Sequence, residues 1–546
     1  MRILQRFKHI PMGVWEYLLL FAAASLRFLY YGFTYFPQLD DYIQFYKYTQ
    51  IGSTAEMIEK LGLLAARPLS GIADLLLWSK FWTLPWLMLL ILAAIWAGSA
   101  FLFRRVFDRC FGCGILFSAI YLLLPLGFEG TYWFSAATRI VCGMFWSALT
   151  MYFFGNWIEG GKRYWLPLWI FCQLLAFGCY EPTLALSGAG ILLLMLRGLY
   201  RDNRRAWWGM LTFSNLLLYF LFTGLHATGA LSSRVVTVFP WEAGYFTYFL
   251  PDLLRQMGAA LLKGGFLTLF RGCLRGAQII LADGGWWYLL LFAAIALGFA
   301  FFCLPPARKT QRRSPRGSRW EAYLFALLLA IAPLTPYLIV ANPWFSLRGT
   351  VPAFAGLALI AALLIDDLWR SRQLVTAILT ACFVMVCGIA SVSELHDYRR
   401  TYHNDTAVLT VFAEQLDGAE GRIGILNLNP NYLTEQNYFY HEHLHGVTES
   451  DWALQGALFG YVDEVPEVVP LATDGFSYYA GWNREMKRIG GFDSLYWWDN
   501  GTQTLTRLTA VGSDGEGWQL FFPDGTPAAY IWEESPYGYI KLGTNT

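Results

Sequence analysis

Residues 81–103 read FWTLPWLMLLILAAIWAGSAFLF, a run of 23 residues without a charged side chain. A helix needs about 20 such residues to cross the roughly 30 Å hydrocarbon layer of a bilayer. Similar runs, separated by charged or turn residues, occur along most of the chain. We therefore expect about eleven membrane-spanning helices, by the same length criterion, near residues 13–36, 81–103, 111–128, 132–154, 164–180, 183–200, 207–229, 286–304, 320–341, 349–367 and 374–391.

Charge divides the chain into two parts. Lys and Arg number 40 and Asp and Glu 39, so 14% of residues are charged, against about 25% in a soluble protein. Residues 1–391 hold 32 basic and 17 acidic side chains, whereas residues 392–546 hold 8 and 22. This pattern excludes one uniform soluble domain, a disordered chain and a small disulfide-built scaffold. We expect a polytopic α-helical membrane domain at 1–391 and a soluble, acidic, extracytoplasmic α/β domain at 392–546.

The positions of Lys and Arg predict the orientation in the membrane. They gather in alternate connections between the expected spans, and such groups stay on the cytoplasmic side. The N-terminus should therefore lie inside, and the acidic C-terminal domain outside, in a multi-pass protein of the cytoplasmic membrane. Residues 230–285 would then begin and end outside. They would therefore cross the membrane either twice or not at all. Because Pro240, Pro251 and the pairs Gly264-Gly265 and Gly284-Gly285 divide them into short amphipathic pieces, we expect interfacial helices there.

The C-terminal domain has the pattern of a mixed α/β fold. A strand is expected at 422–428, after a helical stretch that ends near Leu416, and a helix at 450–459. Turn sequences at 499–501 (Asp-Asn-Gly) and 523–525 (Pro-Asp-Gly) separate runs of aromatic and β-branched residues, which is typical of hairpins.

An acidic pair follows the first expected span directly, in the segment Phe36-Pro37-Gln38-Leu39-Asp40-Asp41-Tyr42. Adjacent carboxylates at a membrane surface need a cation, a donor or water. One of them could act as a general base toward an acceptor hydroxyl, and one could bind a divalent metal or a basic group. The structural alternative is a solvated loop whose acids end a helix.

An interfacial helix is expected next. Ser53-Thr54-Ala55-Glu56 fits a helix-opening capping box, and apolar residues follow on one face. The helix leads to Arg67-Pro68-Leu69, at a depth similar to that of the acidic pair. The Arg67 guanidinium could bind a phosphate bidentately, or form a salt bridge to Asp40 or Asp41.

Other charged groups are expected at comparable depth. Charged groups within spans are costly and are by default functional hypotheses, so we assign Arg139, inside the fourth span, a partner in Glu129 or the acidic pair. A buried structural pair is an equally good interpretation of Arg139. The full set of candidate substrate-binding residues is Tyr42, Arg67, Glu129, Arg139, Glu181 and Arg348.

At this point the sequence resembles a known superfamily. An acidic pair in the first outer loop, an interfacial helix, many spans and a C-terminal outer domain are similar to the GT-C membrane glycosyltransferases. Asp40-Asp41-Tyr42 followed by Arg67-Pro68-Leu69 resembles the bacterial O-antigen glucosyltransferases, over residues 1 to about 200.

The resemblance implies an enzyme that transfers a sugar from a polyprenyl-phosphate-linked donor to a cell-surface glycan, lipid or protein. Asp40 or Asp41 would be the catalytic base, with Mg or Mn as a potential ion at this pair. Arg67 and Arg348 would hold the carrier phosphate. A phosphate leaving group already carries negative charge, so positioning and cationic stabilisation matter more than acid catalysis. No glycine-rich nucleotide cradle is evident, in agreement with a donor that lacks a nucleotide.

Two alternatives stay open. A transporter or polymerase of lipid-linked saccharides would also line its cavity with arginines and acids. The segment His441-Glu442-His443-Leu444-His445 satisfies H-E-x-x-H, which on a helix could bind zinc in a membrane-tethered metallopeptidase. Gly446 follows the second histidine at once, and no third ligand stands out, so an incidental histidine cluster is the default interpretation.

Overall fold

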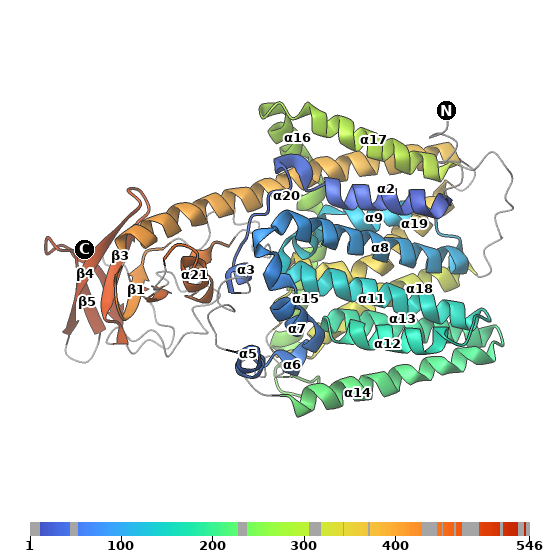
Figure 1. Ribbon diagram of the computed structural model, residues 1–546, viewed down its shortest axis with the longest axis horizontal. Coiled ribbons are helices and arrows are strands. Elements are labelled where there is room, and N and C mark those ends of the chain that lie inside the picture. Colours follow the sequence, from blue (N-terminus) through green and yellow to red (C-terminus); the bar gives the residue numbers. More distant parts are fainter. Residues whose placement is uncertain are drawn as a thin grey trace. The chain divides into compact units, whose positions relative to one another are not determined.

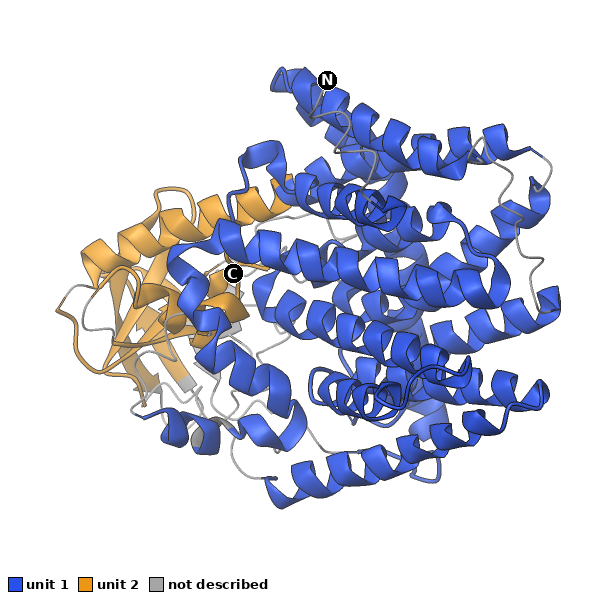
Figure 2. Ribbon diagram, turned by 45° about the vertical axis from the view of Figure 1, so that its right-hand side comes forward, with its two compact units in different colours: residues 1–35, 52–395 blue, residues 36–51, 396–546 orange. Residues whose placement is uncertain are grey.

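The computed structural model describes residues 11–43, 53–227, 237–304, 318–341, 343–369, 372–416, 418–428, 445–449, 451–462, 466–471, 491–513, 517–532 and 540–541. The chain forms two compact units. Unit 1 comprises Met1–Tyr35 and Gly52–Leu395, and unit 2 comprises Phe36–Ile51 and His396–Thr546 (Figures 1 and 2). The loop with the acidic pair thus belongs to the same unit as the C-terminal domain. Each unit is described by itself.

Unit 1 is built of helices, and the expectation of a polytopic α-helical membrane protein is confirmed. Among the described residues, eight helices are long and apolar enough to cross a membrane. Helices α8, α11, α12 and α13 lie side by side within the unit (Figure 1). The helices that matter below are α2 (Met12–Leu26), α5 (Thr54–Leu61), α6 (Leu63–Ala66), α7 (Pro68–Leu76), α8 (Pro85–Phe111), α9 (Ile115–Leu123), α10 (Glu129–Tyr132), α11 (Phe134–Ile158), α12 (Trp165–Phe177), α13 (Glu181–Tyr200), α14 (Leu211–Leu225), α17 (Trp286–Cys303), α18 (Arg319–Ile331) and α19 (Phe354–Leu368).

Helix ends in unit 1 follow local chemistry. Pro85 and Pro182 stand in the first turns of α8 and α13, where a missing N–H costs no hydrogen bond. Gly112 ends α8 with a φ of 75°, a left-handed conformation that glycine adopts without strain. Ser53 caps α5, and its side chain accepts from the N–H of Glu56, as the sequence predicts.

The segment 245–282 differs from expectation. It forms one helix of 38 residues with the length and hydropathy of a membrane span, so the prediction of short separate pieces is wrong. Its parts include α15 (Leu250–Gly258) and α16 (Gly272–Ala282). Turns of π-helix at Tyr245–Phe249, Ala259–Gly264 and Leu267–Arg271 accompany Pro251 and the glycines. Such local adjustment keeps the backbone paired in a helix that contains proline.

Helix α20 (Gln373–Gln415) also differs, because the expected last span and the helical stretch after it form one helix of 43 residues. It carries the chain from unit 1 into unit 2.

Unit 2 contains a seven-stranded sheet in the order β2-β1-β3-β4-β5-β6-β7. Strand β1 pairs in parallel with β2 and β3, and the remaining neighbours are antiparallel. Hairpins join β3 to β4 and β5 to β6 at the two predicted turns, so the α/β prediction is confirmed. The elements are β1 (Arg422–Leu426), α21 (Asp451–Leu458), β2 (Glu467–Leu471), β3 (Ser494–Asp499), β4 (Thr504–Ser513), β5 (Gly517–Phe521), β6 (Pro527–Trp532) and β7 (Ile540–Lys541).

Candidate functional site

The position of Arg67 is fixed by the start of α7. Pro68 occupies the first turn of this helix, and the N–H groups of Leu69 and Ser70 donate to the carbonyl of Gly178 at 2.9 and 3.2 Å. A side chain at position 178 would meet Cβ of Leu69 at 2.9 Å, so the approach is close. These contacts dock α7 against the turn that precedes α13, and they bring Arg67 to the first residue of α13.

Arg67 pairs with Glu181 at that point. Its Nε lies 2.9 Å from both carboxylate oxygens, and its guanidinium stacks over the Tyr180 ring at 4.6 Å. Within the described part of the chain, every hydrogen bond of this guanidinium runs through Nε. The two Nη groups are therefore available to an anion. The side chains of the pair are 28% and 35% exposed, which leaves a path for such a ligand.

The charge of Arg67 is secured by its surroundings. Burial lowers the pKa of the guanidinium, but the Glu181 carboxylate and Tyr180 outweigh this effect, so its pKa is raised above the ordinary value. The positive charge of Arg348 acts in the opposite direction and lowers the pKa of Arg67. Tyr337 connects the segments of the two arginines: its hydroxyl hydrogen-bonds the Tyr180 hydroxyl at 2.9 Å, and a Cβ at Gly349, next to Arg348, would meet the same hydroxyl at 2.8 Å.

Arg348 is the second residue of a short 3₁₀ segment at Leu347–Ala353. Its backbone N–H donates to Glu129 Oε1 at 3.2 Å, and its guanidinium lies over the Trp133 ring at 4.9 Å. Glu129 is fully buried. A Cβ at Gly130 would meet Val351 at 2.8 Å and Cα of Arg348 at 3.3 Å, so glycine permits this packing. The structure thus brings Glu129 and Arg348 together, and Glu129 acts on the backbone that carries Arg348.

Arg139 has a different partner from the one expected. Its Nε lies 3.3 Å from Asp74 Oδ2, with the Asp74 side chain 1% exposed. The assignment of Arg139 to Glu129 or the acidic pair is therefore wrong. Asp74 lies on α7, two turns after Arg67, and was not considered from the sequence because it stands in an apolar helix. The contact joins α7 to α11 and favours a structural role for Arg139.

In unit 2 the acidic pair sits on one turn of helix, α3 (Asp40–Tyr42). The preceding residue, Leu39, has a φ of 41°, which is strained for a branched side chain. Asp41 is fully buried, and its Oδ2 accepts the N–H of Gln38 at 3.0 Å. Tyr42 is also buried, and its hydroxyl donates to the Pro37 carbonyl at 3.4 Å. Asp41 and Tyr42 therefore hold the turn together.

Asp40 is placed differently from Asp41. It is half-buried, and its Oδ1 accepts the indole N–H of Trp452, on α21, at 3.1 Å. In the described residues no hydrogen bond reaches its other oxygen, Oδ2. Asp40 is thus oriented by a neutral donor and keeps an oxygen for a further partner. Trp452 gave no signal in the sequence, because nothing in its surroundings there relates it to position 40.

A metal site at the pair receives no support from additional ligands. In the parts of the chain that the structure describes, no group of three or more His, Cys, Asp or Glu side chains is arranged to hold an ion. The engaged oxygens of Asp40 and Asp41 accept from an indole and a backbone N–H instead. Residues 441–444 of the H-E-x-x-H motif lie outside the described residues, and His445 alone is described.

Arg27 is a buried charge inside the first expected span, 13–36, and it was not among the candidate residues. Its side chain donates to the carbonyls of Ala24 and Leu122 at 3.2 and 3.1 Å, and to the Thr131 hydroxyl at 2.7 Å. It also lies over the Phe28 ring at 4.5 Å. Arg27 thereby fastens α10, which begins with Glu129, to α2 and α9.

Comparisons with known proteins give structural similarity only. No protein-family model matches the sequence, and no curated protein matches it. Two crystal structures of ArnT from Cupriavidus metallidurans are similar to the chain. The structure bound to undecaprenyl phosphate is 14% identical with a TM-score of 0.42, and the match covers 91% of this chain and 96% of that chain. The apo structure is 14% identical with a TM-score of 0.37, at the same coverage.

Proposed function

We propose that this protein is a membrane glycosyltransferase of the GT-C type that the acidic-pair and Arg67-Pro68-Leu69 segments resemble. It transfers a sugar from a polyprenyl-phosphate-linked donor to a cell-surface acceptor, a glycan, a lipid or a protein, on the outer face of the cytoplasmic membrane. The observation that carries the proposal is the geometry of Arg67: Glu181 holds its guanidinium through Nε and the Tyr180 ring lies against it, while its Nη groups make no hydrogen bond to a described residue.

A phosphate suits the two cations Arg67 and Arg348. Guanidinium groups bind phosphate oxygens through parallel N–H donors, and the geometry is strongest when the fork is held in place. Glu181 and the Tyr180 ring hold Arg67 from one side, while Glu129 holds the backbone of Arg348. As the sugar leaves, negative charge grows on the carrier phosphate. Two fixed cations stabilise that charge without reorganisation, which lowers the barrier.

Asp40 is the base in this proposal, and Asp41 positions it. A general base needs an oxygen that can reach the acceptor hydroxyl, and Asp40 Oδ2 has no partner among the described residues. Asp41 is buried and bonded to the backbone of its own turn, so it shapes the loop instead. The strained φ of Leu39 supports the same view, because strain of this kind is retained where a side chain must be held in one direction.

The test is a transfer assay with purified full-length protein, lipid-linked sugar donor and acceptor. Asp40→Asn keeps the shape and the Trp452 contact but removes the base, so kcat should fall by about 10²- to 10⁴-fold. The matched variant Asp41→Asn should mainly lower the melting temperature. Full activity of Asp40→Asn would overturn the assignment of the base. Movement of the lipid-linked saccharide across proteoliposomes, without a glycosylated product, would favour the transporter alternative.

A further inference from the structure

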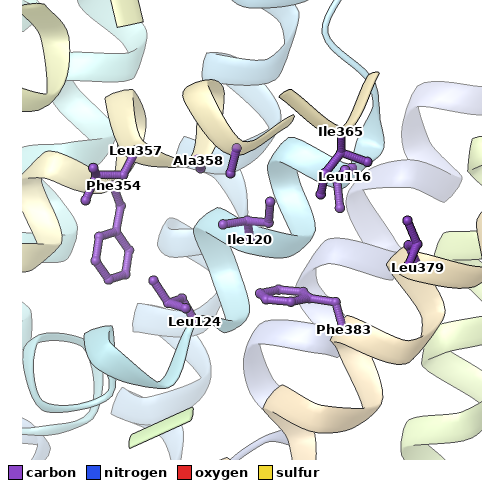
Figure 3. Close-up of a pocket in the computed structure, with 10 residues that line it drawn as sticks. Leu116, Ile120, Leu124, Phe354, Leu357, Ala358, Ile365, Leu379 and Phe383 are labelled. Atoms are coloured by element: carbon purple, nitrogen blue, oxygen red, sulfur yellow. The ribbon is translucent and has the colours of Figure 1, made fainter. Parts of the chain in front are cut away.

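An apolar cavity lies between α9, α19 and α20 in unit 1. Its volume is about 490 Å³, and every residue that lines it is apolar. Figure 3 shows side chains from the three helices directed toward one space. The lining residues are Leu116, Ile120, Leu124, Phe354, Leu357, Ala358, Ala361, Ile365, Leu379 and Phe383. Water needs polar partners to occupy such a space, so a hydrocarbon is the ligand that this lining fits.

The length of the cavity matches one leaflet of a bilayer. Along α19 it extends from Phe354 to Ile365, about 16 Å at the helical rise. This is about half of the 30 Å hydrocarbon layer. Both α19 and α20 belong to helices with the length and hydropathy of membrane spans. A single lipid chain from one leaflet would therefore fill the cavity along its length.

The cavity opens on the α20 side. Leu379 is 38% exposed, whereas Leu116 and Ala358 are buried. The neighbours of Leu379 on the outer surface of α20, Leu374 and Ile378, are also exposed. These apolar side chains face the lipid phase in a membrane, so a chain can enter sideways from the bilayer.

The two ends of the cavity differ. At the Phe354 end, the ring packs so closely on Gly127 that a Cβ there would meet it at 2.6 Å. This contact closes the end toward the segment that carries Arg348. At the other end, Leu379 lies two turns after Arg372, an exposed arginine immediately before α20. In the described residues, no ion pair engages the Arg372 guanidinium.

A carboxylate near this end is already neutralised. Asp367, close to Ile365 in sequence, pairs with Arg319 at 2.8 Å and accepts the Tyr323 hydroxyl at 2.8 Å. Asp367 is therefore engaged by Arg319 and Tyr323 and not by Arg372. Exposed basic residues beside a membrane attract anionic lipids, each by about 1 kcal/mol.

We infer that this cavity is a binding site for one acyl chain of an anionic phospholipid, with the headgroup at Arg372. The lipid would come from the leaflet next to the basic connections, the cytoplasmic leaflet in the predicted orientation. The site is separate from the proposed transfer reaction, and its occupant stabilises the packing of α9, α19 and α20.

The experiment is lipid analysis of the full-length protein, purified in mild detergent, by native mass spectrometry. The wild-type protein should retain an anionic phospholipid. Added phosphatidylglycerol should raise the melting temperature of delipidated protein, because a ligand that binds only the folded state stabilises it. Ala361→Trp fills the cavity and should abolish both effects. The control Ile378→Trp adds the same side chain to the exposed face of α20 and should keep both.

A second variant tests the headgroup without altering the packing. Arg372→Gln should reduce the preference for phosphatidylglycerol over phosphatidylcholine about fivefold, as expected for the loss of one cation. The inference is overturned if the wild-type protein retains no phospholipid, or if Ala361→Trp and Ile378→Trp behave alike. Retention of a polyprenyl phosphate instead would overturn it in favour of the sugar carrier as occupant.

Discussion

Unit 1 contains two arginine–glutamate ion pairs, Arg67–Glu181 and Arg197–Glu321, which differ in the hydrogen bonds of their Nη groups. Arg197 donates from Nε to Glu321 at 2.7 Å and from Nη2 to the Cys110 carbonyl at 2.7 Å, and it is buried. Arg67 also donates from Nε to a glutamate, but among described residues its Nη groups have no acceptor. The first pair closes a helix contact. The second leaves both Nη groups without an acceptor among the described residues, and for this reason Arg67 is the candidate phosphate ligand of the proposal.

Among the variants that test the comparison of these two pairs, the largest effect should come from Arg67→Gln. The change removes the cation that would face the phosphate and leaves Glu181 without its partner. Loss of one preorganised donor to a developing charge costs about 10²- to 10³-fold in kcat. The measurement is steady-state transfer with a lipid-linked donor, at saturating acceptor.

Arg197→Gln is the matched control for that experiment. It breaks an ion pair of the same type, but the donors it removes serve only the fold. We expect a lower melting temperature with nearly unchanged kcat/KM for the protein that remains folded. Equal losses of activity in both variants would show that Arg67 acts, like Arg197, only through the stability of the fold.

A smaller effect, on stability, is expected for Arg27→Met. This arginine resembles Arg197 in that all its described contacts are internal, including two carbonyls and the Thr131 hydroxyl. Removal takes the donor from the Ala24 carbonyl and from the Thr131 hydroxyl, and it leaves the buried Leu122 carbonyl with only the longer bond from the Trp96 indole N–H, at 3.4 Å. Hydrogen bonds to charged groups contribute about 1.5–3 kcal/mol, so unfolding should become easier by about that amount.

Chemical unfolding in detergent micelles measures this change. The control Arg255→Gln breaks an exposed pair with Asp252, for which only a few tenths of a kcal/mol are expected. If Arg27→Met is as stable as this control, the bonds of Arg27 contribute nothing to the fold.

Much of the fold was predictable, because it depends on periodic or local signals. Apolar length indicated the spans near 286–304 and 349–367, and the Asp-Asn-Gly and Pro-Asp-Gly turns placed both hairpins. The helix at 245–282 was missed because Pro251 and the glycines, which break soluble helices, are accommodated here by π-helical turns. The parallel pairing of β1 with β2 and β3 was also beyond prediction, since it joins segments far apart in sequence.

The candidate site was predictable in its residue types and not in its pairings. Position near a membrane boundary pointed to Arg67, Glu181 and Arg348. It could not identify Asp74 as the partner of Arg139, because a single acid in an otherwise apolar helix carries no sequence signal for the helix that it will contact. The difference between Asp40 and Asp41 depends on Trp452, more than 400 positions away in the sequence, which only the fold brings close.

Arg67→Lys sharpens the comparison with a milder change. Lysine keeps the charge but lacks the planar fork, so it cannot hold Glu181 through one nitrogen and a phosphate through others. We expect kcat/KM to fall about tenfold, because this ratio corresponds to the free energy of about one hydrogen bond to a charged group. The readout is the split between KM for the lipid-linked donor and kcat. If Arg67→Lys has the same KM and kcat as the wild-type protein, only the positive charge at position 67 matters.

The smallest effect is expected at Asp499, a carboxylate whose acceptors are used locally, in contrast to Asp40. Its Oδ1 accepts the N–H groups of Gly501 and Thr502 at 2.7 and 2.9 Å. The Thr502 N–H, followed by that of Gly501, lowers the pKa of the Asp499 carboxyl below its ordinary value. Because the folded-state pKa is the lower one, the carboxylate stabilises the hairpin above the unfolded pKa. This contribution is lost as the pH falls through the folded pKa.

Asp499→Asn should therefore lower the melting temperature slightly at neutral pH, and its difference from the wild-type protein should shrink as the medium becomes acidic. Asp524→Asn, in the other hairpin turn, should behave in the same way, because Thr526 likewise lowers the pKa of Asp524. A difference that stays constant with pH would mean that the lost oxygen matters through its shape and not its charge. In that case the negative charge of the turn carboxylates would not contribute to stability. The difference between these carboxylates and Asp40 would then be only that Asp40 accepts a hydrogen bond from Trp452.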